Sequence, residues 1–324
     1  MKKICLTILV CLSLLFAGCG NNEDITKTLT KKINQADGYH VEGLLEIVNN
    51  ENTYKYDIDV AYKKKDNFRV SLKNKANDHE QIILKNDSGV YVLTPSLNKS
   101  FKFQSEWPYN NSQSYLLQNI VEDINNDNKK TITKKDKYDI ISTTVNYPNN
   151  KELTHQKIYV KDGVIKKVEV LNDKDIVKIK MIFNSISFKD KYKDNYFDLA
   201  NNMETDKTTI APTTIEDAVY PMYMPKNTYL SNEEKVSLEN GERIILTFAG
   251  DEPFTLIEQT TDTNPTMEQV DGEVELLNDV FGYISDDIAS WVSNGVEYYA
   301  VSGSMEQDEL LKVINSISVI PVGK

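Results

Sequence analysis

Two sets of residues have types that catalytic or metal sites use. Ser96 and Lys99 stand at the spacing at which a lysine can activate a serine nucleophile. The companion Ser-Asp-Asn and Lys-Thr-Gly motifs are missing, and the stretch has the composition of a turn between strands. The histidines include no pair at metal-binding spacing and no His-Glu-x-x-His motif; they are His40, His79 and His155. We therefore expect no enzymatic activity, no metal and no cofactor.

The N-terminal residues have the pattern of an export signal. Lys2 and Lys3 provide a positive start, and residues 4–17 are nearly all apolar. This run is too short for a membrane-spanning helix, which needs roughly 20 residues. It fits the apolar region of a secretory signal, so we predict a signal peptide over residues 1–18.

Cys19 follows this apolar run and can be acylated on its thiol. Ala17 and Gly18 precede it, and small-small-Cys at this place resembles a bacterial lipobox. The resemblance implies transfer of diacylglycerol to Cys19, cleavage before it, and acyl chains such as palmitate that hold the protein on the membrane. Residues 19–24 would then form a short tether. The alternative is an ordinary signal peptide with an uninvolved cysteine.

Charge divides the chain into two unequal parts. From Met203 onward there are 23 acidic and 6 basic residues, whereas residues 1–202 carry a net charge of +5. The Lys-rich part can lie near an anionic membrane or cell wall. The acidic part would be repelled from both and from nucleic acid, so no nucleic-acid partner is expected. Acidic surface also serves solubility alone, and that explanation stays open.

The first predicted domain covers residues 25–200. Ile25, Leu29 and Ile33 recur every four residues and predict a helix, as does the apolar face of residues 115–124. The other periodic segments alternate like strands: 54–62, 68–72, 82–84, 90–93, 101–103, 168–171 and 176–183. Residues 158–160 meet Val164 through Asp162-Gly163 in a predicted hairpin. Many antiparallel strands with two helices predict an α+β fold, in which one curved half-barrel sheet holds the helices on its concave side.

A second, smaller α+β domain is predicted over residues 218–324, after a linker at 201–217. Its strands flank turn residues, and Asn294-Gly295 predicts a hairpin. Its last element is a helix, for which Ser304 and Gln307 form a predicted capping box.

One segment of the first domain resembles a known family. The order of helix, strands, "VYVLTP", an "NK" turn and "SEWP" before a helix is similar to bacterial LolA-type lipoprotein carriers. Within them, "TPSLNKSFKFQSEWP" followed by "SYLL" resembles the GerS-type germination lipoproteins of spore-forming bacteria, over about residues 20–200. The layout of two domains is also similar to periplasmic regulators of the MucB/RseB type.

The GerS-type resemblance implies a protein partner. Such proteins are not enzymes, and they support an N-acetylmuramoyl-L-alanine amidase that begins modification of the spore cortex. We expect Trp107, Pro108 and Tyr109 to form the partner-binding surface, because Trp and Tyr dominate interface hot spots. The alternative for Trp107 is that it fills the mouth of the curved sheet.

The sequence thus predicts an exported lipoprotein on the outer face of the cytoplasmic membrane, including the membrane around the forespore. Its predicted role is to bind an amidase and so to support sporulation and germination. Two alternatives remain: a carrier that holds a lipid or acyl ligand in the half-barrel, and an envelope sensor of the MucB/RseB type.

Overall fold

The alternating residues of strand β2 (Asn52–Lys63) place Tyr56, Ile58 and Val60 on a buried face, as the sequence predicts. The computed structural model describes residues 25–49, 52–193, 195–204, 214–261 and 266–317. Strand β2 belongs to a sheet of 12 strands. The other strands of this sheet are β1 (Gly38–Asn49), β3 (Asn67–Asn74), β4 (Glu80–Asn86), β5 (Gly89–Thr94), β6 (Lys99–Phe103), β7 (Thr131–Lys135), β8 (Tyr138–Thr144), β9 (His155–Lys161), β10 (Val164–Leu171), β11 (Val177–Ser187) and β15 (Thr266–Val270).

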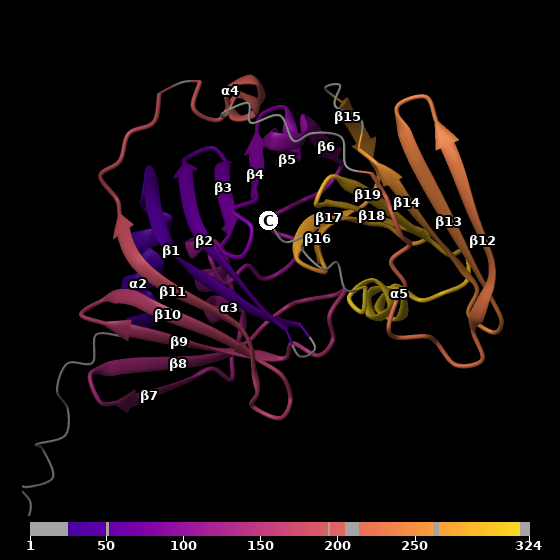
Figure 1. The fold of residues 1–324 in the computed structure, drawn as a ribbon. Helices are drawn as coiled ribbons and strands as arrows, with labels where there is room; N and C mark the ends of the chain where they lie inside the picture. The colour runs from indigo at the N-terminus through magenta and orange to yellow at the C-terminus, as the bar shows by residue number, and fades with distance from the viewer. Residues whose placement is uncertain (1–24, 50–51, 194, 205–213, 262–265, 318–324) are drawn as a thin grey trace, which may run out of the picture.

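The first sheet is curved and open. Its strand order is β15-β6-β5-β4-β3-β2-β1-β11-β10-β9-β8-β7, and the two end strands do not pair with each other. All neighbours are antiparallel except β15 and β6, which run parallel. Figure 1 shows these strands bending around a common side, with β1 to β11 coloured from indigo to rose and β15 in orange. The predicted fold class, α+β with a curved antiparallel sheet, is confirmed.

Two helices cover the concave side, as predicted. Helix α2 (Ile25–Asn34) contributes Leu29 and Ile33 to the main core, and α3 (Leu117–Asn126) contributes Ile120 and Ile124. Helix α3 begins two residues after the predicted start, because Leu116 has the extended backbone of an N-cap residue. Both apolar helix faces are buried against the inward residues of the sheet.

The convex side is partly covered by the chain that follows β11. Helix α4 (Leu199–Met203) and the residues before it lie over β2 to β5. Phe197 is buried there against Ile82, Leu84 and Leu93. The sheet therefore carries apolar side chains on both faces along β4 and β5. This double burial explains why the apolar residues of these two strands form continuous runs and do not alternate with polar ones.

The C-terminal part forms a second sheet of seven strands with α5 (Gln307–Ile314) against it. The strand order is β12 (Tyr229–Leu238), β13 (Gly241–Ala249), β14 (Phe254–Thr260), β19 (Val296–Val301), β18 (Ile288–Ser293), β17 (Val280–Ile284) and β16 (Glu273–Leu277). The predicted hairpin is confirmed: Asn294 and Gly295 join β18 to β19 with φ of 51° and 79°.

The predicted capping box at Ser304 is wrong. Helix α5 starts at Gln307, and its N-cap is Glu306, which makes no side-chain cap hydrogen bond. The Ser302 hydroxyl instead accepts a hydrogen bond from the Met305 amide at 3.2 Å. Ser304 therefore lies within the turn from Ser302 to Met305 and not at the start of the helix.

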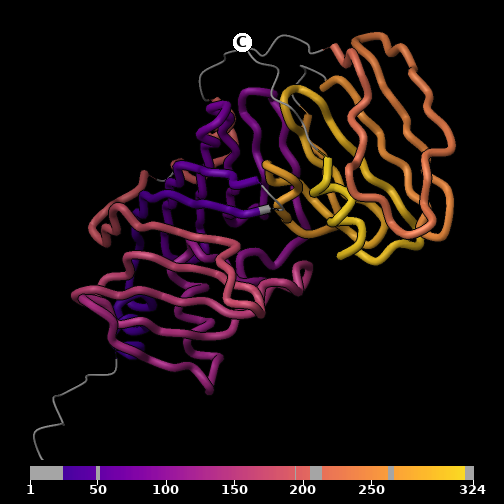
Figure 2. Tube along the Cα trace, turned by 60° about the horizontal axis from the view of Figure 1, so that its bottom comes forward, coloured from indigo at the N-terminus to yellow at the C-terminus, as the bar shows by residue number. Residues whose placement is uncertain are grey.

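The two sheets share one core. Val270, Val274, Phe281 and Tyr283 of the C-terminal part belong to the same buried cluster as the concave face of the first sheet. Figure 2 shows the second sheet, orange to yellow, against one end of the first. Strand β15 crosses over and adds to the first sheet beside β6. Division at residues 201–217 stays a prediction, since residues 205–213 lie outside the described part.

Hydrogen bonds fix the junction of the two sheets. Gln81 of β4 pairs with the backbone of Phe281: its Nε2 donates to the carbonyl at 2.8 Å and its Oε1 accepts from the amide at 2.7 Å. The Tyr56 hydroxyl donates to the Asp279 carbonyl at 2.7 Å. Buried backbone groups at the join are thereby satisfied, as a stable interface needs.

Candidate functional site

Cys19 belongs to residues 1–24, which the structure does not describe, so its lipidation stays a prediction. Among the described residues, no helix is both long and apolar enough to cross a membrane.

Trp107 and Pro108 do not lie at the surface, contrary to the predicted partner-binding surface. Trp107 is 1% exposed and packs edge-on against Phe68, with ring centroids 5.9 Å apart. Pro108 is buried after a cis peptide bond, and its carbonyl accepts a hydrogen bond from Asn119 at 2.6 Å. Trp107 belongs to the buried core on the concave side, which agrees with the alternative that it fills the mouth of the curved sheet.

Tyr109 is the exposed member of the three. Its side chain is 41% exposed, and its hydroxyl donates to the Asp66 carboxylate at 2.7 Å. The Lys85 ammonium lies 4.7 Å from the ring centroid and donates to the Trp107 carbonyl at 2.9 Å. We call Tyr109, Asp66 and Lys85 the Tyr109 rim. An aromatic ring between two opposite charges is a surface that a protein partner can contact.

The concave side is filled by the protein itself. Leu116, Ile120 and Ile124 are fully buried there, and Phe281 and Tyr283 close it from the second sheet. Of the polar groups inside, the Asp123 carboxylate accepts hydrogen bonds from Ser112 at 2.8 Å and from Gln156 at 2.7 Å, whereas Trp107 Nε1 and the Tyr115 hydroxyl have no partner among the described residues. Burial raises the pKa of Asp123 to about 7. The apolar faces of the described helices thus pack directly against the concave face of the sheet.

Ser96 and Lys99 form no hydrogen bond with each other. Ser96 lies in a short 3-10 helix, Pro95–Leu97, and its buried hydroxyl has no hydrogen-bond partner among the described residues. The Lys99 ammonium lies 3.2 Å from a carboxylate oxygen of Glu297. A lysine held in a buried ion pair is a poor base for a serine nucleophile.

A polar pocket of about 670 Å³ lies on the convex face, next to the segment that ends in α4. Its centre is Arg69 of β3, whose Nε donates to Asn202 Oδ1 at 2.7 Å. The guanidinium lies 3.7 Å from oxygens of both Asp59 and Glu80. Tyr196 forms one wall, 6.0 Å from the guanidinium carbon. Such a pocket fits small polar molecules, and the sequence had no local signal for it.

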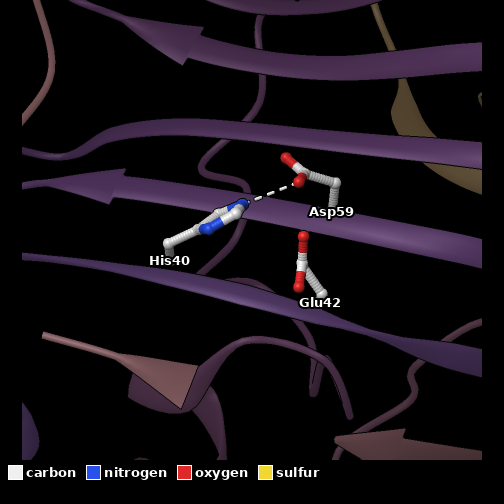
Figure 3. A group of neighbouring side chains, drawn as sticks. All are labelled: His40, Glu42 and Asp59. Atoms are coloured by element: carbon white, nitrogen blue, oxygen red, sulfur yellow. Dashed lines mark hydrogen bonds and ion pairs between the residues drawn. The ribbon is translucent and has the colours of Figure 1, made fainter. Parts of the chain in front are cut away.

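Beside this pocket, His40, Glu42 and Asp59 converge (Figure 3). His40 and Glu42 lie two residues apart on β1 and so share its outer face. Asp59 of β2 is the direct cross-strand partner of Glu42. The spacing of the histidines along the sequence did not reveal this cluster, because its other members are carboxylates and Asp59 comes from the neighbouring strand. His40-x-Glu42 in a strand was the one signal available.

Comparison with known proteins gives one curated relative at high coverage. The chain is 32% identical over 332 residues to the sporulation protein YdcC of Bacillus subtilis, and the match covers 98% of each chain. No protein-family model matches it.

Solved structures with a similar arrangement have low identity. The MucA/MucB complex of Pseudomonas aeruginosa is 11% identical, with a TM-score of 0.34, and the match covers 92% of this chain and 99% of that one. One chain of the structure of the CwlD amidase from Clostridioides difficile in complex with the GerS lipoprotein is 16% identical, with a TM-score of 0.24, and the match covers 54% of this chain and 98% of that one.

Proposed function

This chain belongs to the family of the Bacillus subtilis sporulation protein YdcC, and from that premise we propose that it is a non-enzymatic binding protein of the cell envelope. It is anchored through lipid on Cys19 to the outer face of the cytoplasmic membrane, including the membrane around the forespore. There it binds an N-acetylmuramoyl-L-alanine amidase and supports modification of the spore cortex and, later, germination.

The observation that carries this proposal is the likeness to a sporulation protein along nearly the whole chain, since 98% of both sequences is matched. The amidase as partner rests on the sequence segment that resembles GerS-type lipoproteins, residues 93–118. Within that segment, Tyr109 is exposed and lies beside Asp66 and Lys85. The Tyr109 rim is therefore the surface that we assign to the partner.

Two structural observations support binding over other roles. The concave side is filled by α2, α3 and the second sheet, which leaves the outer surfaces for interaction. Ser96 and Lys99, the pair with the spacing of a catalytic dyad, form no hydrogen bond with each other: Lys99 pairs with Glu297, and the Ser96 hydroxyl has no partner among the described residues. Both agree with a protein that acts by contact.

The test is affinity capture from sporulating cells with the full chain lacking the lipid, residues 20–324. We expect an amidase to co-purify with the unaltered protein and much less with Tyr109→Ala. Tyr229→Ala is the matched control, because Tyr229 is 62% exposed on the distant edge strand β12. Capture that yields no amidase contradicts the proposal, and stoichiometric acyl chains extracted from the purified protein would point to a carrier.

Anchoring is tested separately by Cys19→Ala in the complete precursor. We expect the wild-type chain to incorporate labelled palmitate and to be cleaved before Cys19, and the variant to show neither, because cleavage at a lipobox follows transfer of diacylglycerol to the thiol. Labelling of the variant as strong as that of the wild type would show that Cys19 does not carry the anchor.

A further inference from the structure

Three side chains on the outer face of β1 and β2 offer ligand atoms at one point. One nitrogen of His40 and one oxygen each of Glu42 and Asp59 lie within 4.8 Å of one another. His40 Nε2 already contacts Asp59 Oδ2 at 2.6 Å. Figure 3 shows the imidazole and both carboxylates turned toward a common centre.

The sheet holds these residues in fixed positions. Strands β1 and β2 pair along twelve residues, and each has a second neighbour, β11 and β3. Glu42 and Asp59 are opposite each other across the strands, and His40 precedes Glu42 by two positions. The register therefore keeps the Cβ atoms of Glu42 and Asp59 side by side on the same face of the sheet.

Two carboxylates directly opposite on one sheet face repel each other and destabilise the pairing. Arg69 offsets part of this charge, but its guanidinium lies 3.7 Å from Asp59 Oδ1 and is shared with Glu80. On the other side, the Ser185 hydroxyl donates to Glu42 Oε2 at 2.9 Å. Among Glu42, Asp59, Glu80 and Arg69, the negative charge exceeds the positive charge by two.

We propose that His40, Glu42 and Asp59 bind one Zn²⁺ ion. One imidazole nitrogen with two carboxylate oxygens is a ligand set that zinc accepts, whereas calcium and magnesium prefer oxygen alone. Tetrahedral zinc with bonds of about 2.0–2.2 Å holds its ligands roughly 3.4 Å apart. The present spacing reaches that value by small side-chain rotations. The ion neutralises the opposed carboxylates, and Ser185 orients Glu42 by its hydrogen bond.

The fourth position of such an ion faces solvent, since His40 and Asp59 keep 26% and 38% of their side chains exposed. Water or an acidic or histidine side chain from another protein can fill it. This site does not depend on the amidase proposal, because it lies on β1 and β2 and shares no residue with the Tyr109 rim.

A second histidine of the same protein serves as the control. His155 Nε2 lies 3.1 Å from Asp175 Oδ1, so it also forms a His-carboxylate pair. Lys157, however, places its ammonium 2.9 Å from the same oxygen. That ammonium occupies the position of a metal ion, and we expect no zinc at His155.

The experiment uses residues 20–324, stripped of metal by a chelator and titrated with Zn²⁺ in a calorimeter. We expect one site per chain for the wild type and for His155→Gln. His40→Gln and Glu42→Gln should each weaken that site by at least tenfold. Circular dichroism establishes that the variants keep their fold. Because Glu42 is exposed, Glu42→Gln still tests the site if His40→Gln impairs folding.

Cobalt gives an independent readout, because Co²⁺ at a tetrahedral nitrogen and oxygen site absorbs visible light. We expect this absorption in the wild type and its loss in His40→Gln. The proposal is overturned if the wild type binds no zinc, or if His40→Gln and His155→Gln bind it equally well. Equal binding would mean adventitious uptake by the acidic surface.

Discussion

Lys99 of β6 and Glu297 of β19 form an ion pair that is buried between the two sheets. The Lys99 ammonium lies 3.2 Å and 3.3 Å from the two oxygens of Glu297, and the side chains are only 5% and 2% exposed. The Glu268 carboxylate of β15 approaches the same ammonium at 3.6 Å. One lysine of β6 thus contacts both its sheet neighbour β15 and β19 of the second sheet.

Replacing Lys99 by Met should strongly destabilise the protein, because Glu297 would be left as an unpaired buried charge. Loss of one partner of such a pair costs about 3–5 kcal/mol. The measurement is unfolding by denaturant. Lys312→Ala breaks the ion pair with Glu309 on the exposed side of α5 and should cost less than about 1 kcal/mol. Similar losses in both variants would show that the buried pair contributes no more than a surface pair.

Trp107→Ala and Tyr109→Ala should separate stability from partner binding. Trp107 is buried against Phe68, so its truncation should lower the free energy of unfolding by about 3–5 kcal/mol. Tyr109 loses a hydrogen bond to Asp66 at the surface and should cost about 1 kcal/mol. Thermal unfolding followed by circular dichroism measures both. A Tyr109 variant as unstable as the Trp107 variant would rule out a mainly external role for Tyr109.

Gly43→Ala should destabilise the first sheet where β1 is irregular. The pairing of β1 with β11 shifts between Glu42 and Gly43, and a methyl group on Gly43 would run into the Ile182 carbonyl. That oxygen belongs to the neighbouring strand and cannot move freely, so we expect a loss of about 1–3 kcal/mol. Gly303→Ala is the matched control. Nothing lies within 4 Å of its added carbon, and its stability should change by about 0.5 kcal/mol or less.

Glu258 should make stability fall as the pH rises. Its side chain is fully buried on β14, and burial raises its pKa from 4.5 to about 7, although the Val219 amide donates to it at 2.8 Å. Between these pH values the folded state binds more protons than the unfolded state, so the contribution of Glu258 to stability is complete below pH 4.5 and is lost as the pH rises through 7. A pKa difference of this size corresponds to at most about 3 kcal/mol.

Glu258→Gln keeps an acceptor for the Val219 amide but carries no charge. We expect denaturant unfolding of this variant at a series of pH values to show a smaller decline from pH 5 to pH 8 than the wild type. Glu234→Gln, at an exposed position on β12, should keep the full decline. If the dependence of stability on pH is unchanged in Glu258→Gln, other groups are responsible for it. Asp123 and Glu275 are candidates, because their pKa values are also raised to about 7.

Several elements could be predicted from sequence because their signals are local. The alternation in β2, the helix stripe of α2 and the turn at Asn294-Gly295 all appear where expected. Two edge strands, β12 and β7, could not be predicted from the sequence pattern. Strand β12 is exposed over nearly its whole length, and β7 over all of it, so neither carries an apolar period. Backbone pairing with one neighbour holds them in the sheets.

The α+β class, the curved antiparallel sheet and the helices on its concave side could all be predicted from residue order, because periods of two and of about four residues record which face of an element is buried. Which elements meet became visible only in the folded protein. The tertiary fold turned Trp107 inward, set Asp59 opposite Glu42, and paired Lys99 with Glu297 across a separation of 198 residues. Such contacts depend on how strands order and sheets pack in space, and no local pattern of residue types specifies that order.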